Sequence, residues 1–341
     1  MLTRLIEILL CSFLLLFSAQ LHSHAKVDNI RLANGNDITG EIKRLLRGKL
    51  SYGTDSMGTV EIEWQDVTAV ASDFHYEVRL ESGKRYYGSL GLADNKGHVR
   101  IVTIAGEQVV KAIDIVELRP IEDTLEQRLD IRLGAGYSYT KASDVATFNL
   151  TSELGYEDEK GITSLQGRTV YTDNDGERSD SNRYQITREM WTSRPQVIRW
   201  FDGSYEDNEE LDLDYRYTVG FGYGRAFADN NDLSLVGYLG LQAVTEKDGS
   251  GEKLDSVEGV LGAAYSMWRF DTPELDLELD FTLYPGITES DRLRANTDLR
   301  LSWELVEDLF WDITGWASYD DASESGSDTD YGVTTGVSWE Y

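Results

Sequence analysis

The sequence predicts an all-β protein, an antiparallel transmembrane β-barrel of about 12 strands that follows a small duplicated SH3-like β domain. Three observations lead to this prediction: long segments of alternating apolar and polar residues after Pro120, a chain end inside such a segment, and a repeated pattern before Pro120. The composition agrees, because aromatic residues make up 11% of the chain and only four prolines occur.

Residues 1–25 have the features of a cleaved signal peptide. Arg4 precedes an apolar run at positions 8–17, and the small residues Ser23 and Ala25 follow at the positions that a signal peptidase requires. A membrane anchor is the alternative, but the run is shorter than the ~20 apolar residues that cross a bilayer. The only cysteine, Cys11, lies in this segment, so we expect a mature protein without disulfides.

Residues 26–120 contain two related halves, about 28–72 and 76–120, offset by 48 positions. The matching positions include an arginine between two apolar residues, and three glycines: Ile30, Arg31, Leu32, Gly35, Gly40 and Gly58 recur as Val78, Arg79, Leu80, Gly83, Gly88 and Gly106. Glycines at matching offsets imply matching turns. We expect two small periplasmic β-modules, which either bind peptidoglycan or a protein partner or serve as a spacer.

Residues 121–341 show the period-two alternation of transmembrane strands. Twelve segments of about 11 to 14 residues suit tilted strands that cross a bilayer, and they begin near residues 129, 144, 161, 180, 196, 211, 232, 254, 274, 291, 309 and 329. An even number fits a single-chain barrel with both ends in the periplasm. We expect long external connections at 172–182, 245–253 and 320–328, and short periplasmic ones at 193–195, 270–273 and 306–308.

Aromatic residues give a further indication of the barrel. Seven of them fall next to the expected periplasmic turns or the C-terminus, where an interfacial girdle would lie: Trp191, Trp268, Phe270, Trp303, Phe310, Trp311 and Trp339. The chain also ends on an alternating series that is typical of the signal read by the barrel assembly machinery: Tyr331, Val333, Val337, Trp339 and Tyr341. We therefore expect contact with that machinery, with outer-membrane lipid and with lipopolysaccharide.

Charge is concentrated in the predicted barrel. The net charge is −29, and residues 121–341 hold 46 acidic against 18 basic residues, which argues against a nucleic-acid partner. The polar phase of the strands predicts the lumen-facing residues Asp212, Asp214, Arg216, Asp276, Glu278, Asp280, Arg294, Asp298 and Arg300. Either these charges pair and fill a narrow lumen, or the surplus carboxylates line a cation-preferring pore.

The inventory of histidines argues against an enzyme. All four lie at or before His98, outside the predicted barrel, so a histidine-dependent hydrolase in the barrel wall is excluded. His75 and His98 are not spaced as metal ligands, and residues 173–177 match only the opening of a calcium loop. We therefore expect no catalytic residues, no metal site and no cofactor.

Several segments resemble a known family. The pattern at residues 30–40 and 60–67, the segment 193–207 with Arg199, Trp200 and Phe201, and the last strand are similar to YdiY-like, salt-induced outer-membrane proteins. The resemblance implies a stress-induced envelope protein in the outer membrane, and brings no established activity. Two functions remain open: a narrow cation-preferring channel, or an envelope-anchoring or binding protein that uses the periplasmic domain and has a plugged barrel.

Overall fold

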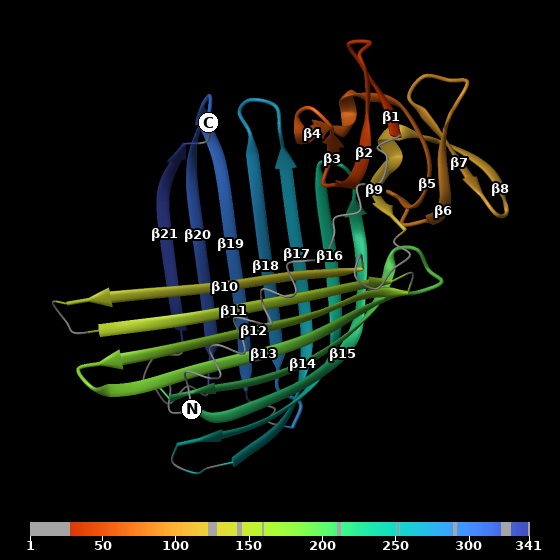
Figure 1. The fold of residues 1–341 in the computed structure, drawn as a ribbon. Coiled ribbons are helices and arrows are strands. Elements are labelled where there is room, and N and C mark those ends of the chain that lie inside the picture. The colour runs from red at the N-terminus through yellow and green to blue at the C-terminus, as the bar shows by residue number, and fades with distance from the viewer. Residues whose placement is uncertain are drawn as a thin grey trace, which may run out of the picture.

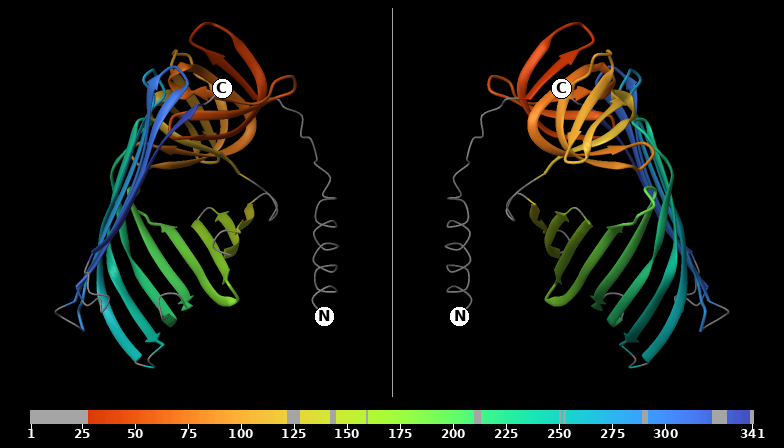
Figure 2. Two further views of the ribbon diagram at one scale, coloured as in Figure 1. Left: turned by 90° about the vertical axis from the view of Figure 1, so that its left-hand side faces the viewer. Right: turned by 90° about the vertical axis from the view of Figure 1, so that its right-hand side faces the viewer.

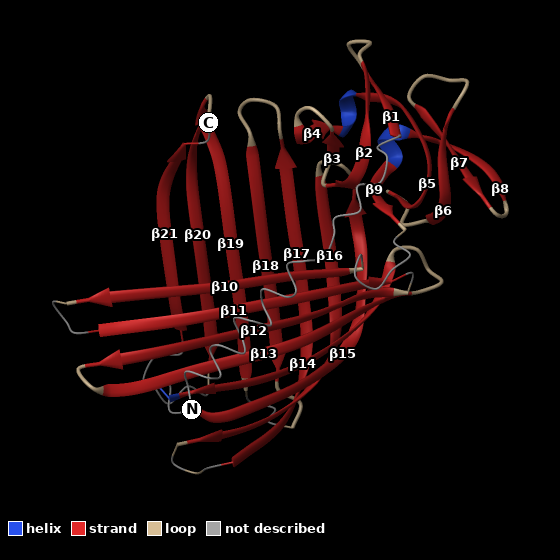
Figure 3. Cartoon of the chain, viewed as in Figure 1, coloured by secondary structure: helices blue, strands red, loops and turns tan. Residues whose placement is uncertain are grey.

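The computed structural model describes residues 28–121, 128–141, 145–158, 160–209, 213–249, 251, 253–288, 292–321 and 329–339. These residues form a nine-stranded sheet followed by a twelve-stranded sheet (Figure 1). Apart from two short 3-10 helices, nearly all of the described chain is strand or turn (Figure 3). None of the described helices is long and apolar enough to cross a lipid bilayer. The predicted signal peptide lies outside the described residues.

The N-terminal domain consists of two series of elements. They are β1 (Asp28–Leu32), β2 (Asp37–Leu46), β3 (Lys49–Thr54), β4 (Gly58–Glu63) and η1 (Trp64–Asp66), then β5 (Val67–Leu80), β6 (Arg85–Leu92), β7 (His98–Thr103), β8 (Gly106–Lys111), η2 (Ala112–Asp114) and β9 (Ile115–Pro120). The first half of β5 pairs with β1 to complete the first series, and its second half pairs with β9 in the second. The predicted small duplicated β domain is therefore present.

Equivalent hydrogen bonds recur in the two series. The Ala33 amide donates to the Asp66 carbonyl at 2.7 Å, and 48 positions later the Glu81 amide donates to the Asp114 carbonyl at 2.8 Å. A β-bulge follows Arg31 in the first series and Arg79 in the second. The repeat in the sequence thus corresponds to a repeat in backbone geometry.

One hydrophobic core serves both series. The indole of Trp64 in η1 is 1% exposed and donates to the carbonyl of Ala112, the matching residue of η2, at 2.7 Å. Asp28 is fully buried beside this core and accepts hydrogen bonds from the Ile42 amide at 2.6 Å, the Tyr76 hydroxyl at 2.9 Å and Ser72. Burial, together with the Asp28 carboxylate, raises the pKa of Tyr76 well above its ordinary value, so this phenol stays a donor.

The second sheet contains the twelve antiparallel strands that the sequence predicts. They are β10 (Leu129–Thr140), β11 (Val145–Asp158), β12 (Gly161–Asn174), β13 (Glu177–Trp191), β14 (Val197–Asn208), β15 (Leu213–Asp229), β16 (Leu233–Asp248), β17 (Lys253–Arg269), β18 (Leu275–Pro285), β19 (Leu293–Val306), β20 (Leu309–Asp320) and β21 (Thr329–Trp339). Each strand pairs with its neighbours in chain order. The prediction of twelve strands is confirmed.

The sheet curves strongly, and the N-terminal domain lies over its concave side at one end (Figure 2). We call this end the turn end, because it carries the connections around residues 158–161, 191–197, 229–233, 269–275 and 306–309. The opposite end is the loop end. β10 and β21 form the two edges, and no hydrogen-bonded register joins them among the described residues.

The connections expected at 193–195 and 270–273 lie between strands, the one expected at 306–308 begins at the last residue of β19, and the one expected at 245–253 is reduced to 249–252 because β16 continues to Asp248. Of the connection expected at 320–328, residues 322–328 lie outside the described residues. The segment 172–182 is not a long loop: β12 and β13 continue to a two-residue turn at Asp175 and Gly176, whose φ angles are +52° and +88°. Two positive φ angles define a type I′ turn, which matches the twist of paired strands. The polar residues around this turn are therefore strand residues.

Candidate functional site on the inner face of the sheet

The two faces of the twelve-stranded sheet differ in chemistry. On β15, the side chains of Tyr217, Val219, Phe221 and Tyr223 are each more than half exposed, while the glycines between them are buried. We call the apolar face the outer face and the opposite, concave face the inner face. An exposed apolar band is what contact with lipid requires.

Glycines on the inner face make room for Trp200 of β14. Gly222 of β15 and Gly240 of β16 are paired, and a Cβ atom at Gly222 would lie 2.6 Å from the Trp200 ring. The ring therefore reaches across neighbouring strands, as a concave surface allows. Its Nε1 is buried without a hydrogen-bond partner in the described part of the chain. This part of the inner face is filled by side chains.

Several inner-face charges are neutralised by close partners. Arg294 of β19 reaches over β18 to Glu258 of β17, with Nε 3.0 Å from Oε1, and Glu258 also accepts from Gln242 at 2.6 Å. Glu258 is only 1% exposed, so both contacts are needed to offset the loss of hydration. Arg216 pairs with Glu246 at 2.7 Å. These pairs narrow the space over β15–β19.

A row of carboxylates on β18 and β19 is less completely paired. Asp276, Glu278 and Asp280 alternate along the inner face of β18, spaced by about 6.7 Å. Arg300 lies 3.5 Å from Glu278, whereas Asp280 is paired in register with Asp298 of β19. Neither of these two aspartates has a hydrogen bond or ion pair to a described residue. We call Asp276, Glu278, Asp280 and Asp298 the acidic column.

The N-terminal domain contacts the turn-end part of the acidic column through Arg47. This residue lies in the two-residue turn between β2 and β3, and its guanidinium is 3.1 Å from Asp276 and 3.0 Å from Glu278. It also stacks over the indole of Trp268, 4.7 Å from the ring centroid. The inner face and the first domain thus share one charged cluster.

The same contact region contains polar and aromatic anchors. The side-chain amide of Asn231, in the turn after β15, donates to the carbonyls of Ile113 at 2.9 Å and Ile115 at 3.1 Å. The Trp268 indole, 5% exposed, donates to the Asn231 carbonyl. Lys49 lies 4.0 Å over the Phe270 ring. Specific hydrogen bonds and ring contacts therefore hold the two domains together.

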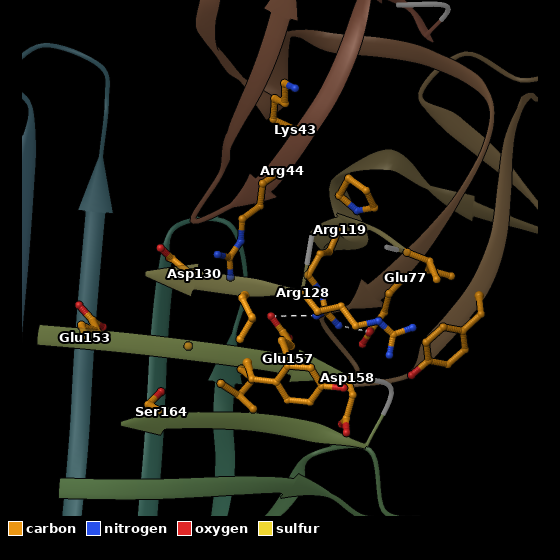
Figure 4. Close-up of a pocket in the computed structure, with 17 residues that line it drawn as sticks. Lys43, Arg44, Glu77, Arg119, Arg128, Asp130, Glu153, Glu157, Asp158 and Ser164 are labelled. Carbon is orange, nitrogen blue, oxygen red and sulfur yellow. Dashed lines mark hydrogen bonds and ion pairs between the residues drawn. The ribbon is translucent and has the colours of Figure 1, made fainter. Parts of the chain in front are cut away.

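Two further arginines join the domains. Arg79 pairs with Asp229, and Arg119 pairs with Glu157 at 2.8 Å. Figure 4 shows Arg119 between Glu157 of the sheet and Glu77 of the first domain, at the edge of a pocket of about 340 Å³. The Arg44 side chain also points into this pocket from β2 (Figure 4). The pocket lies at the domain junction, close to the turn end of β10–β12.

The structure places most of the predicted lumen-facing residues on one face. By register with the glycine-bearing face of β15 and β16, the inner face carries Arg216, Asp276, Glu278, Asp280, Arg294, Asp298 and Arg300. Asp214 instead lies in a β-bulge and pairs with Lys247, and Asp212 lies outside the described residues. Sequence reasoning missed Arg47, because nothing in the first repeat marks a residue that reaches another domain.

The predicted aromatic girdle is only partly correct. Trp303, Trp311 and Trp339 are exposed on the outer face, as a girdle requires. Trp191 and Trp268 belong to the inner phase and stack with Arg85 and Arg47 of the first domain, and Phe310 is 8% exposed. Aromatics beside a turn look alike in sequence whether they meet lipid or a docked domain.

The C-terminal strand keeps the predicted phase. Tyr331, Val333, Val337 and Trp339 are all exposed on the outer face, with between 62% and 73% of their surface accessible. Tyr341 lies outside the described residues. The strand therefore presents an apolar row that suits lipid contact.

The described residues contain no group of three or more side chains arranged to hold a metal ion. In the predicted partial calcium loop, the Asp173 carboxylate accepts from the Gly176 amide and from Arg178, each at 3.1 Å. Both oxygens thus stabilise the turn itself.

Comparison with protein families decides the identity of the second domain. The model of a family described as "Protein of unknown function, DUF481" matches residues 133–339, more than half of the chain. The chain belongs to the DUF481 family. This is a family of YdiY-like outer-membrane β-barrel proteins, so the resemblance seen in the sequence is confirmed. A search of curated proteins gave no match.

Membership in DUF481 agrees with the fold. The matched residues cover the strands from β10 to β21 almost completely, and the first domain lies before the match. This DUF481 protein is therefore an outer-membrane β-barrel protein. The family description names no activity.

Proposed function

We propose that this DUF481 protein is a narrow, cation-preferring channel of the outer membrane. The observation that carries the proposal is the direct pairing of Asp280 with Asp298 on the inner face, where neither carboxylate is neutralised by a described residue. Carboxylates that line a confined aqueous path raise the local concentration of cations. The ion pairs of Glu246 and Glu258 would narrow this path without adding net charge.

Basic residues elsewhere on the inner face limit the path to one side of the barrel. Arg168 of β12 and Arg183 of β13 are paired in register, six strands away from Asp280 and Asp298 in a sheet of twelve. In a closed barrel, a separation of six strands is half of the circumference. Cations would therefore follow the acidic column and avoid the opposite wall.

We further propose that the turn end and the N-terminal domain lie in the periplasm, after removal of residues 1–25. Short connections are typical of the periplasmic side of such barrels. The docking of the first domain at this end supports the same orientation.

The channel proposal is tested with purified protein in planar bilayers of synthetic phosphatidylcholine. We expect discrete current steps and a reversal potential on the cation-selective side in a KCl gradient. D280N and D298N should each shift the reversal potential toward zero, whereas D94N, the same change in an exposed loop of the first domain, should not. A correctly folded preparation without steps, or one selective for anions, would remove the proposal.

A binding or anchoring function is the second candidate. One observation favours it: apolar side chains of β6–β8 and their connections are exposed on the first domain, namely Leu92, Val102, Ile104 and Val109. Purified protein should then co-sediment with purified peptidoglycan, and replacement of Ile104 by serine should reduce the bound fraction severalfold. Protein that stays in the supernatant would argue against peptidoglycan as the partner.

We also propose that the protein is not an enzyme. Residues 121–341 contain no histidine, which removes the usual general base from the barrel. The inner-face carboxylates with the closest contacts, Glu246 and Glu258, are held by arginines. A search for hydrolysis of phospholipid or peptide substrates by the folded protein should give no turnover, and any turnover abolished by an inner-face substitution would contradict this proposal.

A further inference from the structure

We infer that Asp276, Glu278 and the indole of Trp268 form a binding site for a monovalent cation whose N–H groups donate hydrogen bonds, and that Arg47 occupies this site as a tethered ligand. The inference rests on the proposed channel, because the site lies at the turn end of the same acidic column. It adds a specific ligand chemistry and a means of closing the path.

The geometry around Arg47 is that of a bound guanidinium. Nη2 is 3.1 Å from Asp276 Oδ1 and Nη1 is 3.0 Å from Glu278 Oε1, so the two sides of the planar group meet two different carboxylates. The Trp268 ring covers its face at 4.7 Å. Two carboxylates and an indole face are also what a free guanidinium or alkylammonium ion would require.

The turn that carries Arg47 is built to reach the site. Arg47 and Gly48 have φ angles of +52° and +72°, which allow a two-residue connection between β2 and β3. A Cβ atom at Gly48 would lie 2.6 Å from the Asn231 carbonyl oxygen, so only glycine lets the turn come this close to the sheet. The tip of the β2–β3 connection therefore packs against the turn end of the twelve-stranded sheet.

The tethered side chain can leave the site without undocking the domain. Arg79 with Asp229, Arg119 with Glu157, and the amide of Asn231 hold the two domains through other residues. The Arg47 side chain is 33% exposed, and Asp276 is 49% exposed, so water and ions reach the pair. An accessible ion pair exchanges with free cations more easily than a buried one.

The second repeat provides a matched comparison. The equivalent connection, between β6 and β7, spans residues 93–97 and is longer than the turn at Arg47. It carries Lys96, which has no ion pair to a described residue of the sheet. K96A thus removes one positive charge from the same place in the other repeat and serves as the control for R47A.

The first experiment is chemical rescue in planar bilayers with the full mature chain. R47A should raise the K⁺ conductance or the open probability about threefold or more, whereas K96A should leave both unchanged. Millimolar guanidinium chloride should then block R47A and have at least tenfold less effect on the wild type. Equal block of both proteins, or an unchanged R47A, would overturn the inference.

A second experiment does not depend on conduction. Ser302 is paired in register with Asp276, and a cysteine there reports access to the site, because the chain has no other cysteine beyond position 11. A cationic methanethiosulfonate should label S302C about tenfold faster when combined with R47A than with K96A, and guanidinium should slow only the R47A labelling. Equal rates would overturn the inference; faster labelling without any current in either protein would instead remove the channel proposal.

Discussion

Glu117 shows how charge is used inside the N-terminal domain. Its carboxylate lies 2.8 Å from Arg79 and 3.4 Å from Arg44, and the residue is 8% exposed. Burial opposes ionisation, but the two guanidinium groups outweigh it and hold the pKa of Glu117 below its ordinary value. A lowered pKa in the folded state means that the unfolded state binds the proton more readily. The resulting stability is present above the ordinary glutamate pKa and is lost as the pH falls through the lower, folded value.

We therefore predict that Glu117→Gln lowers the free energy of unfolding of the first domain by about 2 kcal/mol at neutral pH. The difference from the wild type should shrink below about pH 4, where the unfolded glutamate takes up a proton. Urea denaturation of residues 26–120, which enclose their own core, measures this directly. A difference that stays constant down to pH 3 would contradict the assigned role of the ion pairs. E61Q, an exposed change in the same domain, is the control.

Single residues were predictable where one strand determines their direction. The alternation along β18 and β19 was enough to put Asp276, Glu278, Asp280 and Asp298 on a common face. Arg47 and Trp268 were not predictable in this way, because their contact joins residues more than two hundred positions apart. Nor does a strand pattern show that Trp200 requires glycines on two neighbouring strands. Such contacts depend on curvature and docking, which local periodicity does not encode.

β21 illustrates how the strands separate their two environments. Val333 is 70% exposed on the outer face, and Thr334, its neighbour in the chain, points to the inner face. Both lie near the middle of the strand, so they differ in environment and not in depth. A charge at the lipid-facing position must be desolvated, whereas a charge at the inner position remains hydrated.

We predict that Val333→Arg destabilises the folded protein in lipid vesicles by about 2 to 4 kcal/mol, and that Thr334→Arg costs less than about 1 kcal/mol. The stabilities of both variants are measured as the midpoint of urea unfolding, and the folded fraction is detected on a gel by the difference in mobility between heated and unheated samples. Equal effects of the two substitutions would contradict the assignment of the faces. The same two variants also test the predicted insertion signal. If V333R assembled more slowly than T334R but had normal stability, the apolar row of β21 would act in assembly and not in stability.

The element boundaries were predictable to within a few residues because long alternating runs leave little freedom. All twelve expected starting positions lie within three residues of the observed ones. The error at residues 172–182 has a physical cause, since Asp175 and Gly176 form a tight turn whose flanking strands are polar on both faces at the loop end. Polarity alone does not distinguish such a strand end from a loop.

The arrangement of all twelve strands determines how the sheet can close. A line drawn through residues that are paired across successive strands moves from the turn end of the sheet toward the loop end. It begins at Leu129, at the turn end of β10, passes through Tyr156 and Phe221, and reaches Gly259, which is far from the turn end of β17. Such a stagger is what a tilted barrel requires. Because a strand edge cannot remain unpaired in lipid, we expect β10 and β21 to pair in the membrane.

We predict the register of this closing pair. For twelve strands tilted by about 35–45°, the stagger over one full turn is roughly 12 to 16 residues, and the observed registers then put Trp339 opposite Leu129, Ile131 or Leu133. All four residues face outward, as partners in one register must.

W339C combined with L129C, I131C or L133C should form an intramolecular disulfide in one of the three pairs, while R132C with W339C, which lie on opposite faces, should not. L309C with W339C, neighbours in β20 and β21, is the positive control. If only the positive control forms, the closing register is wrong; if the seam pairs form disulfides only between molecules, two sheets must complete one another edge to edge.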